Sequence, residues 1–232
     1  MENLGGIARP LASHFTVHSL DLPNHGRSAH TDAMILPDMA TDVLAWMDRQ
    51  GLTSAHILGH SLGGKVAMEL ALRDARRIKS LVVLDIAPVT YPPHHDAVFE
   101  GLLALELNQI ESRAQADDFL KSYVPELAVR SFLLKNLVKE PQGFRWRINL
   151  PVIHKNYRHL IAANSEKGIF AGPTLFIKGG NSDYIQEQQR DAILSRFPKA
   201  AVKIVPETGH WLHAEKPELV ARLVQRFLAT GK

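Results

Sequence analysis

The sequence predicts an α/β protein with a mostly parallel sheet, helices on both faces of that sheet, and a helical lid. Three observations lead to this fold class. Short runs of β-branched and apolar residues alternate with amphipathic helical stretches along most of the chain, as in consecutive βαβ units. The run at residues 80–88 (SLVVLDIAP) is almost continuously apolar, which is typical of a strand buried on both faces. One long segment, residues 91–172, is mostly helical and interrupts the alternation.

The first part of the alternation predicts three strands and two helices. The helix at residues 36–51 is the clearest, because Pro37 suits a first helical turn and Gly51 ends the amphipathic pattern. A second helix follows the GHSLGG stretch that begins at Gly59. The strands are expected at residues 15–22 (FTVHSLDL), 55–60 (AHILGH) and 80–88.

The helical segment is expected to divide the chain into two domains. Residues 1–90 and 173–232 would form the sheet core, and residues 91–172 would form the lid, inserted between two strands. The end of the lid, FRWRINLP at residues 144–151, either pairs as a short hairpin or lies extended. After the lid the alternation resumes, with strands at 173–180 and 201–207, a helix near 185–196 between them, and a final helix at 217–229.

The composition excludes several classes of function. The chain has no cysteine, so it has no disulfide, no thiolate metal site and no cysteine nucleophile. The formal net charge is +3, but the lysines and arginines are scattered, which argues against a nucleic-acid partner. No apolar run approaches the roughly 18 residues of a membrane span, and MENLGGIARP lacks the apolar core of a signal peptide. We therefore expect a cytoplasmic protein.

Residues 59–63 (GHSLG) match the pattern G-x-S-x-G, with Ser61 at its centre. The pattern is short, but here a predicted strand precedes it and a predicted helix follows, which is the setting of a nucleophile on a sharp turn. Flanking glycines would let the backbone turn tightly and expose the Ser61 hydroxyl. The amide of Leu62, at the helix N-terminus, would then donate a hydrogen bond to a developing oxyanion. The alternative is that Ser61 simply caps the helix.

A serine hydroxyl needs a base, and His210 is the leading candidate. It lies in PETGHWLHAEKP, after the last predicted strand, so its loop is expected at the carboxyl ends of the strands, beside Ser61. His213 is a rival base, although it is expected where the next helix begins. Four other histidines are not spaced like metal ligands, and no acidic residue accompanies them in a ligand pattern. No metal site is therefore expected at His94, His95, His154 or His159.

Two aspartates follow predicted strands and compete for the role of triad acid. Asp85 follows the strand after that of Ser61, in LVVLDIAP, and Asp183 follows the strand beyond the lid, in FIKGGNSDYI. Either carboxylate would hold the imidazole of His210 in the required tautomer and stabilise the imidazolium. Each aspartate could also be an ordinary turn residue. Asp85 stands shortly before Pro88, and Asp183 ends the stretch GGNSD, whose composition is typical of turns. The residues alone leave both open.

With these residues in place, the chain resembles the α/β-hydrolase superfamily and, within it, the YbfF-type bacterial esterases and their mitochondrial abhydrolase relatives. The matching segments span nearly the whole chain and are together more specific than G-x-S-x-G alone. They are DLPNHGRS (21–28), GHSLGGKVAM (59–68), LDIAPV (84–89), FLLKNLV (132–138), WRINLP (146–151), GPTLFIKGGNS (172–182) and GHWLHAEKP (209–217).

The resemblance implies an α/β-hydrolase fold and a serine esterase that acts on small acyl esters, or also on acyl thioesters, without a cofactor. It favours Asp85 as the acid, because the YbfF-type pattern carries its aspartate in D-I-A-P and is often not acidic where Asp183 stands. The wider superfamily usually places its acid at the position of Asp183, so that residue remains the alternative.

The chain departs from the family pattern at its start. Such hydrolases carry a strand and an H-G-x-x-G-like turn ahead of the segment that matches NLGGIARPLASHF, and the backbone of that turn supplies a second oxyanion donor. We therefore expect an N-terminally truncated sheet with fewer than the usual eight strands. Losing one oxyanion donor typically lowers a rate by about 100- to 1000-fold. A sheet left open at such an edge also favours a dimer, although the sequence leaves the oligomeric state undecided.

Two functions from different classes follow. The leading expectation is a serine hydrolase of small carboxylic esters that works through an acyl-enzyme, with Ser61, His210 and an aspartate as its triad. The same scaffold also serves thioester and carbon–carbon bond hydrolysis, peptide cleavage after proline and cofactor-free haloperoxidation, which a triad does not separate. The alternative is a non-catalytic or weakly active binding protein, which a missing oxyanion segment favours and a complete triad disfavours.

Overall fold

The computed structural model describes residues 2–230, which fall into two compact units. The sheet unit comprises residues 2–20, 35–91 and 162–230, and the helical unit comprises residues 21–34 and 92–161. Two segments far apart in the sequence therefore build the helical unit. No helix in the described part of the chain combines the length and the apolar character needed to cross a membrane.

The sheet unit is built on four parallel strands among the described residues, in line with the expectation of fewer than eight. In spatial order they are β1 (Ala55–His60), β2 (Ile78–Leu84), β5 (Thr174–Gly179) and β6 (Ala200–Val205). The register pairs His60 with Leu84, and Leu84 with Ile177. Because all four strands run the same way, the residues that follow them meet at one edge of the sheet.

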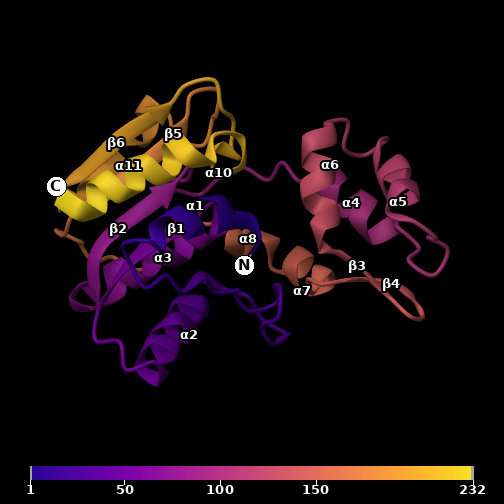
Figure 1. Cartoon of the computed structure of the whole chain (residues 1–232), viewed down its shortest axis with the longest axis horizontal. Helices are drawn as coiled ribbons and strands as arrows, with labels where there is room; N and C mark the ends of the chain where they lie inside the picture. Colours follow the sequence, from indigo (N-terminus) through magenta and orange to yellow (C-terminus); the bar gives the residue numbers. More distant parts are fainter. Residues whose placement is uncertain (1, 231–232) are drawn as a thin grey trace. The chain divides into compact units, whose positions relative to one another are not determined.

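Helices cover both faces of this sheet (Figure 1). The helical elements of the unit are η1 (Glu2–Leu4), α1 (Gly5–Leu11), α2 (Leu36–Arg49), α3 (Leu62–Arg73), η2 (Ala75–Arg77), η4 (Glu187–Gln189), α9 (Arg190–Arg196), α10 (Leu212–Glu215) and α11 (Pro217–Thr230). On one face, Leu84 and Ile177 share a buried core with α1 and α11. On the other face, α3 packs against β1 and β2, and α2 packs against α3. The predicted parallel sheet with helices on both faces is therefore confirmed.

Most predicted elements of the sheet unit form close to their expected bounds. The strand at 55–60 is β1, the run at 80–88 contains most of β2, and the final helix is α11. The helix expected near 185–196 begins later, because a 3-10 turn, η4, precedes α9. Helix α1 has no counterpart in the sequence prediction, because its two glycines and Pro10 weaken the helical pattern.

Residues 15–22 are not a strand, and the sequence prediction was wrong there. They form irregular chain, and Val17 and Leu20 are 36% and 39% exposed. Within the part of the chain that the structure describes, no strand pairs with them. A run of residues with high β propensity becomes a strand only where a neighbouring strand satisfies its backbone groups.

The helical unit contains short helices and one hairpin. Its elements are α4 (Asp96–Ala104), α5 (Arg113–Leu120), α6 (Leu127–Leu133), η3 (Leu134–Asn136), β3 (Leu137–Glu140), β4 (Gly143–Trp146), α7 (Leu150–Lys155) and α8 (Tyr157–Leu160). Strands β3 and β4 pair antiparallel, so the start of the 144–151 segment takes the hairpin alternative. The fully buried Asn24 fastens the 21–34 loop, since its Oδ1 accepts from Nδ2 of Asn149 at 3.0 Å and from the amide of Thr31 at 2.9 Å.

Candidate active site

Ser61 alone makes the turn between β1 and α3. It takes φ 52° and ψ −119°, a region that costs a non-glycine residue of order 1–3 kcal/mol unless the surroundings fix it. Two backbone hydrogen bonds fix it here: the Ser61 amide donates to the carbonyl of Leu84, and the Lys65 amide donates to the carbonyl of Ser61. The side chain of Ser61 makes no capping hydrogen bond, so the simple helix-cap alternative is wrong.

Two glycines allow β1 and α3 to cross this closely. A Cβ on Gly59 would lie 2.1 Å from the carbonyl oxygen of Gly63, and a Cβ on Gly64 would lie 2.6 Å from Cγ2 of Ile86. Both distances are far below van der Waals contact, so each position requires glycine. A Cβ on Gly63 would meet no atom within 4 Å, so a side chain would fit there. Of the two glycines that flank the motif, only Gly59 is therefore needed for the tight turn at Ser61.

His210 lies in the loop between β6 and α10, at the same edge of the sheet as Ser61. Its Nε2 is 3.0 Å from Oγ of Ser61, and its Nδ1 is 2.8 Å from Oδ2 of Asp85. A carboxylate can only accept, so Nδ1 carries the proton in the neutral ring and Nε2 is left as an acceptor for the serine hydroxyl. This is the arrangement of nucleophile, base and orienting acid that general-base activation requires.

Asp85 follows β2 directly and is fully buried. The sheet fixes its backbone, because its amide donates to the carbonyl of Ile177 at 2.9 Å. Its Oδ1 accepts from the amide of Gly179 at 2.9 Å, and its Oδ2 accepts from the hydroxyl of Ser182 as well as from His210. Buried polar groups need such hydrogen-bond partners, and these three donors fix the direction of the carboxylate.

The other two candidates from the sequence lie elsewhere. Asp183 is exposed, and its Oδ1 accepts from Nε2 of Gln186 at 3.2 Å. His213 is buried in α10, with its ring 4.1 Å from the ring of His60. Among the described residues, Ser61 is thus grouped with His210 and Asp85, and not with Asp183 or His213.

The sequence argument missed two further residues of this site. Ser182, next to Asp183, supplies the hydroxyl that bonds to Asp85. The ring of Tyr184 stacks on the imidazole of His210 at 3.9 Å between centroids and 21° between planes. The carbonyl of Tyr184 accepts from the hydroxyl of Tyr91 at 2.5 Å, which fastens the backbone of Tyr184. Both missed residues flank Asp183 in the turn-like stretch after β5, where the sequence argument considered only the aspartate.

Leu62 is the first residue of α3, directly after Ser61. The first four amides of a helix have no acceptor within the helix, and the helix dipole places partial positive charge there. The structure thus places Leu62 at the N-terminus of α3, and its role as an oxyanion donor stays a prediction.

Comparison with known proteins identifies the family. A model of the alpha/beta hydrolase fold matches residues 2–217. The chain belongs to the α/β-hydrolase family. Esterase YbfF of Escherichia coli strain K12 is 38% identical over 229 residues, covering 98% of this chain and 88% of that protein. The sn-1-specific diacylglycerol lipase ABHD11 of Mus musculus is 36% identical over 219 residues, covering 92% and 71%.

Solved structures agree with this family. A marine microorganism esterase is 33% identical, with a TM-score of 0.94 over 97% of this chain and 90% of that chain. The resemblance to YbfF-type esterases, inferred from seven short segments, is thereby confirmed. The α/β-hydrolase fold expected from it is confirmed as well.

A second buried charge of this hydrolase lies on α3, one turn beyond Ser61. Lys65 is 2% exposed, and its Nζ donates to the carbonyls of Val89 at 2.7 Å and Ala162 at 2.5 Å. Burial lowers the pKa of the Lys65 ammonium to about 8. The fully buried Glu69 stands one turn further along α3, and its carboxylate accepts from Nδ2 of Asn164 at 2.8 Å. Lys65 and Glu69 thus fasten backbone segments to α3.

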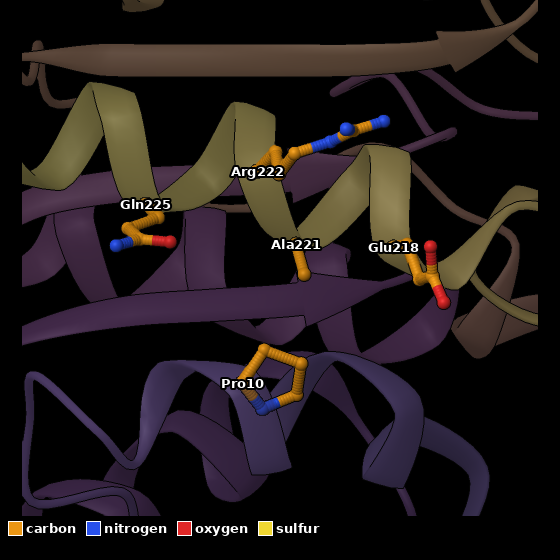
Figure 2. A pocket seen from close by; sticks show the side chains of 5 residues that line it. All are labelled: Pro10, Glu218, Ala221, Arg222 and Gln225. Carbon is orange, nitrogen blue, oxygen red and sulfur yellow. The ribbon is translucent and has the colours of Figure 1, made fainter.

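A small hollow of about 160 Å³ lies away from Ser61, between α1 and α11 of the hydrolase fold (Figure 2). It is lined by Pro10, Glu218, Ala221, Arg222 and Gln225. None of these side chains belongs to the group around Ser61. Within the described residues, no cluster of three or more histidine, aspartate or glutamate side chains is arranged to hold a metal ion.

Proposed function

We propose that this chain is a serine hydrolase that cleaves small carboxylic esters through an acyl-enzyme intermediate. One observation carries the proposal: a single imidazole, that of His210, lies 3.0 Å from Oγ of Ser61 and 2.8 Å from the carboxylate of Asp85. The names of the relatives, an esterase and a diacylglycerol lipase, support carboxylic esters as the substrate class.

In the first half of the proposed reaction, Oγ of Ser61 attacks the acyl carbon while its proton passes to Nε2 of His210. Asp85 holds the ring by Nδ1 and stabilises the imidazolium. The amide of Leu62 donates to the oxyanion of the tetrahedral intermediate. The bond to the alcohol oxygen then breaks, and the proton on Nε2 passes to the leaving alcohol.

In the second half, water attacks the acyl-enzyme and gives its proton to Nε2 of His210. The new tetrahedral intermediate releases the carboxylic acid when the bond to Oγ breaks and the proton returns from Nε2 to Ser61. An acyl thioester follows the same route, with a thiol as the leaving group. Asp85 orients the ring and does not itself take the proton, so His210 is the group that accepts and returns each proton.

The test is hydrolysis of p-nitrophenyl acetate and butyrate by the wild type and by Ser61→Ala. We expect Ser61→Ala to lower kcat by at least about 1000-fold, because no other group replaces the attacking oxygen. Ser195→Ala is the matched control, since that hydroxyl is exposed and bonds only locally to the carbonyl of Ala192. It should retain wild-type activity.

A fluorophosphonate probe gives a second readout of the same proposal. It should label the wild type and Ser195→Ala, and it should not label Ser61→Ala. A folded wild type that neither turns over esters nor reacts with the probe would favour the alternative of a non-catalytic binding protein.

A further inference from the structure

A histidine next to Ser61 is bonded to the backbone of the residue proposed as the base. Nε2 of His60 lies 2.8 Å from the carbonyl oxygen of His210. We propose that His60 is a positioning residue, which fixes the imidazole of His210 against Ser61 by tying the main chain of His210 to the end of β1. This inference rests on the proposed function and adds a role that the triad geometry does not include.

The direction of this hydrogen bond is set by its chemistry. A carbonyl oxygen can only accept, so the Nε2 of His60 must carry a proton. Burial and the neighbouring rings of His213 and His210 hold the pKa of His60 well below its usual range. His60 is therefore neutral at neutral pH, and it places no positive charge beside the ring of His210, 4.7 Å away between centroids.

The loop that carries His210 is fastened at each residue leading up to it. The hydroxyl of Thr208 donates to the carbonyl of Val205 at 2.8 Å, and the amide of Gly209 donates to the carboxylate of Glu215 at 3.1 Å. The bond from His60 holds the backbone of His210 itself. His60 directly precedes Ser61 in the chain. Its hydrogen bond therefore ties the backbone of His210, the proposed base, to the residue next to the proposed nucleophile.

The ring of His210 must satisfy two partners at once, Ser61 at 3.0 Å and Asp85 at 2.8 Å. Both distances depend on where the backbone of His210 lies. A displacement of about 1 Å in such a site typically costs about 100-fold in rate. Loss of the His60 bond should therefore lower kcat far more than it changes substrate binding.

The competing explanation is that His60 only fills space between the rings of His210 and His213. Two substitutions separate the explanations. His60→Phe keeps an aromatic ring of similar size and removes the N–H donor. His60→Gln removes the ring and keeps an N–H donor at a similar reach along the side chain. Positioning predicts that Gln is the better replacement, and packing predicts that Phe is.

The experiment measures kcat and KM for p-nitrophenyl butyrate in the wild type, His60→Phe and His60→Gln, with melting temperatures to check folding. We expect His60→Phe to lower kcat about 100-fold with KM changed by no more than about twofold, and His60→Gln to stay within about tenfold of the wild type. A kcat for His60→Phe equal to or above that of His60→Gln overturns the inference. So does a wild type without Ser61-dependent turnover, in which case the proposed function fails first.

A measurement on the wild type covers the case in which His60→Phe does not fold. Nitrogen-15 NMR of the imidazoles, with the His60 signals assigned by their loss in His60→Gln, reports which ring nitrogen carries the proton. A neutral His60 ring protonated at Nε2 supports the inference. A ring protonated at Nδ1, or at both nitrogens near pH 7, overturns it whatever the activity of the chain.

Discussion

Asp85 and Lys65 are two buried residues of charged type in the sheet unit, and they differ in what they bond to. Asp85 is 0% exposed and accepts from the ring of His210, whose other nitrogen faces Ser61. Lys65 is 2% exposed, and its Nζ donates to the backbone carbonyls of Val89 and Ala162. Equal burial thus accompanies two different roles: one charge is linked to a group that can transfer a proton, and the other holds the backbone.

The difference also limits what a perturbed pKa indicates. Strongly shifted pKa values often mark functional sites. In this hydrolase the pKa of Lys65 is lowered to about 8, and the first cause is burial. Its Nζ donates to the backbone carbonyls of Val89 and Ala162. The size of a pKa shift does not show whether a buried residue belongs to the proposed reaction centre. The hydrogen-bond partners do, since Asp85 bonds to His210 and Lys65 bonds to backbone carbonyls.

Replacing Asp85, the proposed acid, gives the largest expected effect. Asp85→Asn should lower kcat by about 1000- to 10 000-fold, because the amide can donate to Nδ1 of His210 and stabilise the wrong tautomer. Ester hydrolysis by folded protein measures this, with the melting temperature as the check on folding. A loss below about tenfold would show that Asp85 is no more tied to the reaction than Lys65 is.

The second effect concerns stability and distinguishes Lys65 from Asp85. The pKa of Lys65 falls from 10.5 to about 8 on folding, so between these pH values the unfolded chain binds a proton that the folded chain does not. The stability linked to this group is therefore fully present above pH 10.5 and is lost as the pH falls to 8. At about 1.36 kcal/mol per pKa unit, this shift corresponds to about 3 kcal/mol.

Urea titrations of the wild type and Lys65→Met between pH 8 and about pH 10 measure that effect. The unfolding free energy of the wild type minus that of Lys65→Met should rise with pH, because the variant lacks the titrating amine. The same difference taken with Lys199→Met, whose lysine is exposed, should stay flat. A flat difference for both variants would mean that Lys65 is not buried as a charge.

A smaller effect sharpens the account of how Asp85 is held. Ser182→Ala removes one donor to the Asp85 carboxylate and leaves the amide of Gly179 and the ring of His210 in place. A hydrogen bond to a charged group contributes about 1.5 kcal/mol at the low end, so kcat should fall roughly tenfold. Ser195→Ala, an exposed serine, is the control. An unchanged kcat in Ser182→Ala would mean that the Gly179 amide and His210 suffice.

The sequence predicted the sheet better than its surroundings, for physical reasons. Strands such as β1 and β2 are local apolar runs, so their pattern is visible without knowing the fold. Residues 15–22 have the same β-type composition but lack a partner strand among the described residues, and pairing is not a local property. Helix α1 was missed because its stability comes from packing against α11, which composition does not report.

The residues of the site also fall into those that a local sequence pattern reveals and those that only the folded structure brings together. Ser61 and His210 stand in recognisable local patterns, and both were named from the sequence. The choice between Asp85 and Asp183 depends on side-chain directions after two strands. Register sets the direction of Asp85, since the pairing of Leu84 with Ile177 brings the Asp85 carboxylate to the amide of Gly179. The contributions of Ser182, Tyr184 and His60 come from contacts between residues distant in the sequence, which no local pattern encodes.

The smallest expected effect completes the comparison, because it concerns an aspartate that follows a neighbouring strand but is not buried. Asp183→Asn should leave kcat within about twofold and the unfolding free energy within about 0.5 kcal/mol, as for surface substitutions in general. The exposed carboxylate bonds to Gln186, and an asparagine oxygen can accept the same hydrogen bond. The double variant Asp85→Asn with Asp183→Asn should match Asp85→Asn alone, because the two aspartates share no partner and their effects should add. A double variant tenfold weaker than Asp85→Asn would mean that Asp183 substitutes for the lost acid, and a tenfold loss in Asp183→Asn by itself would make Asp183 the acid of the triad.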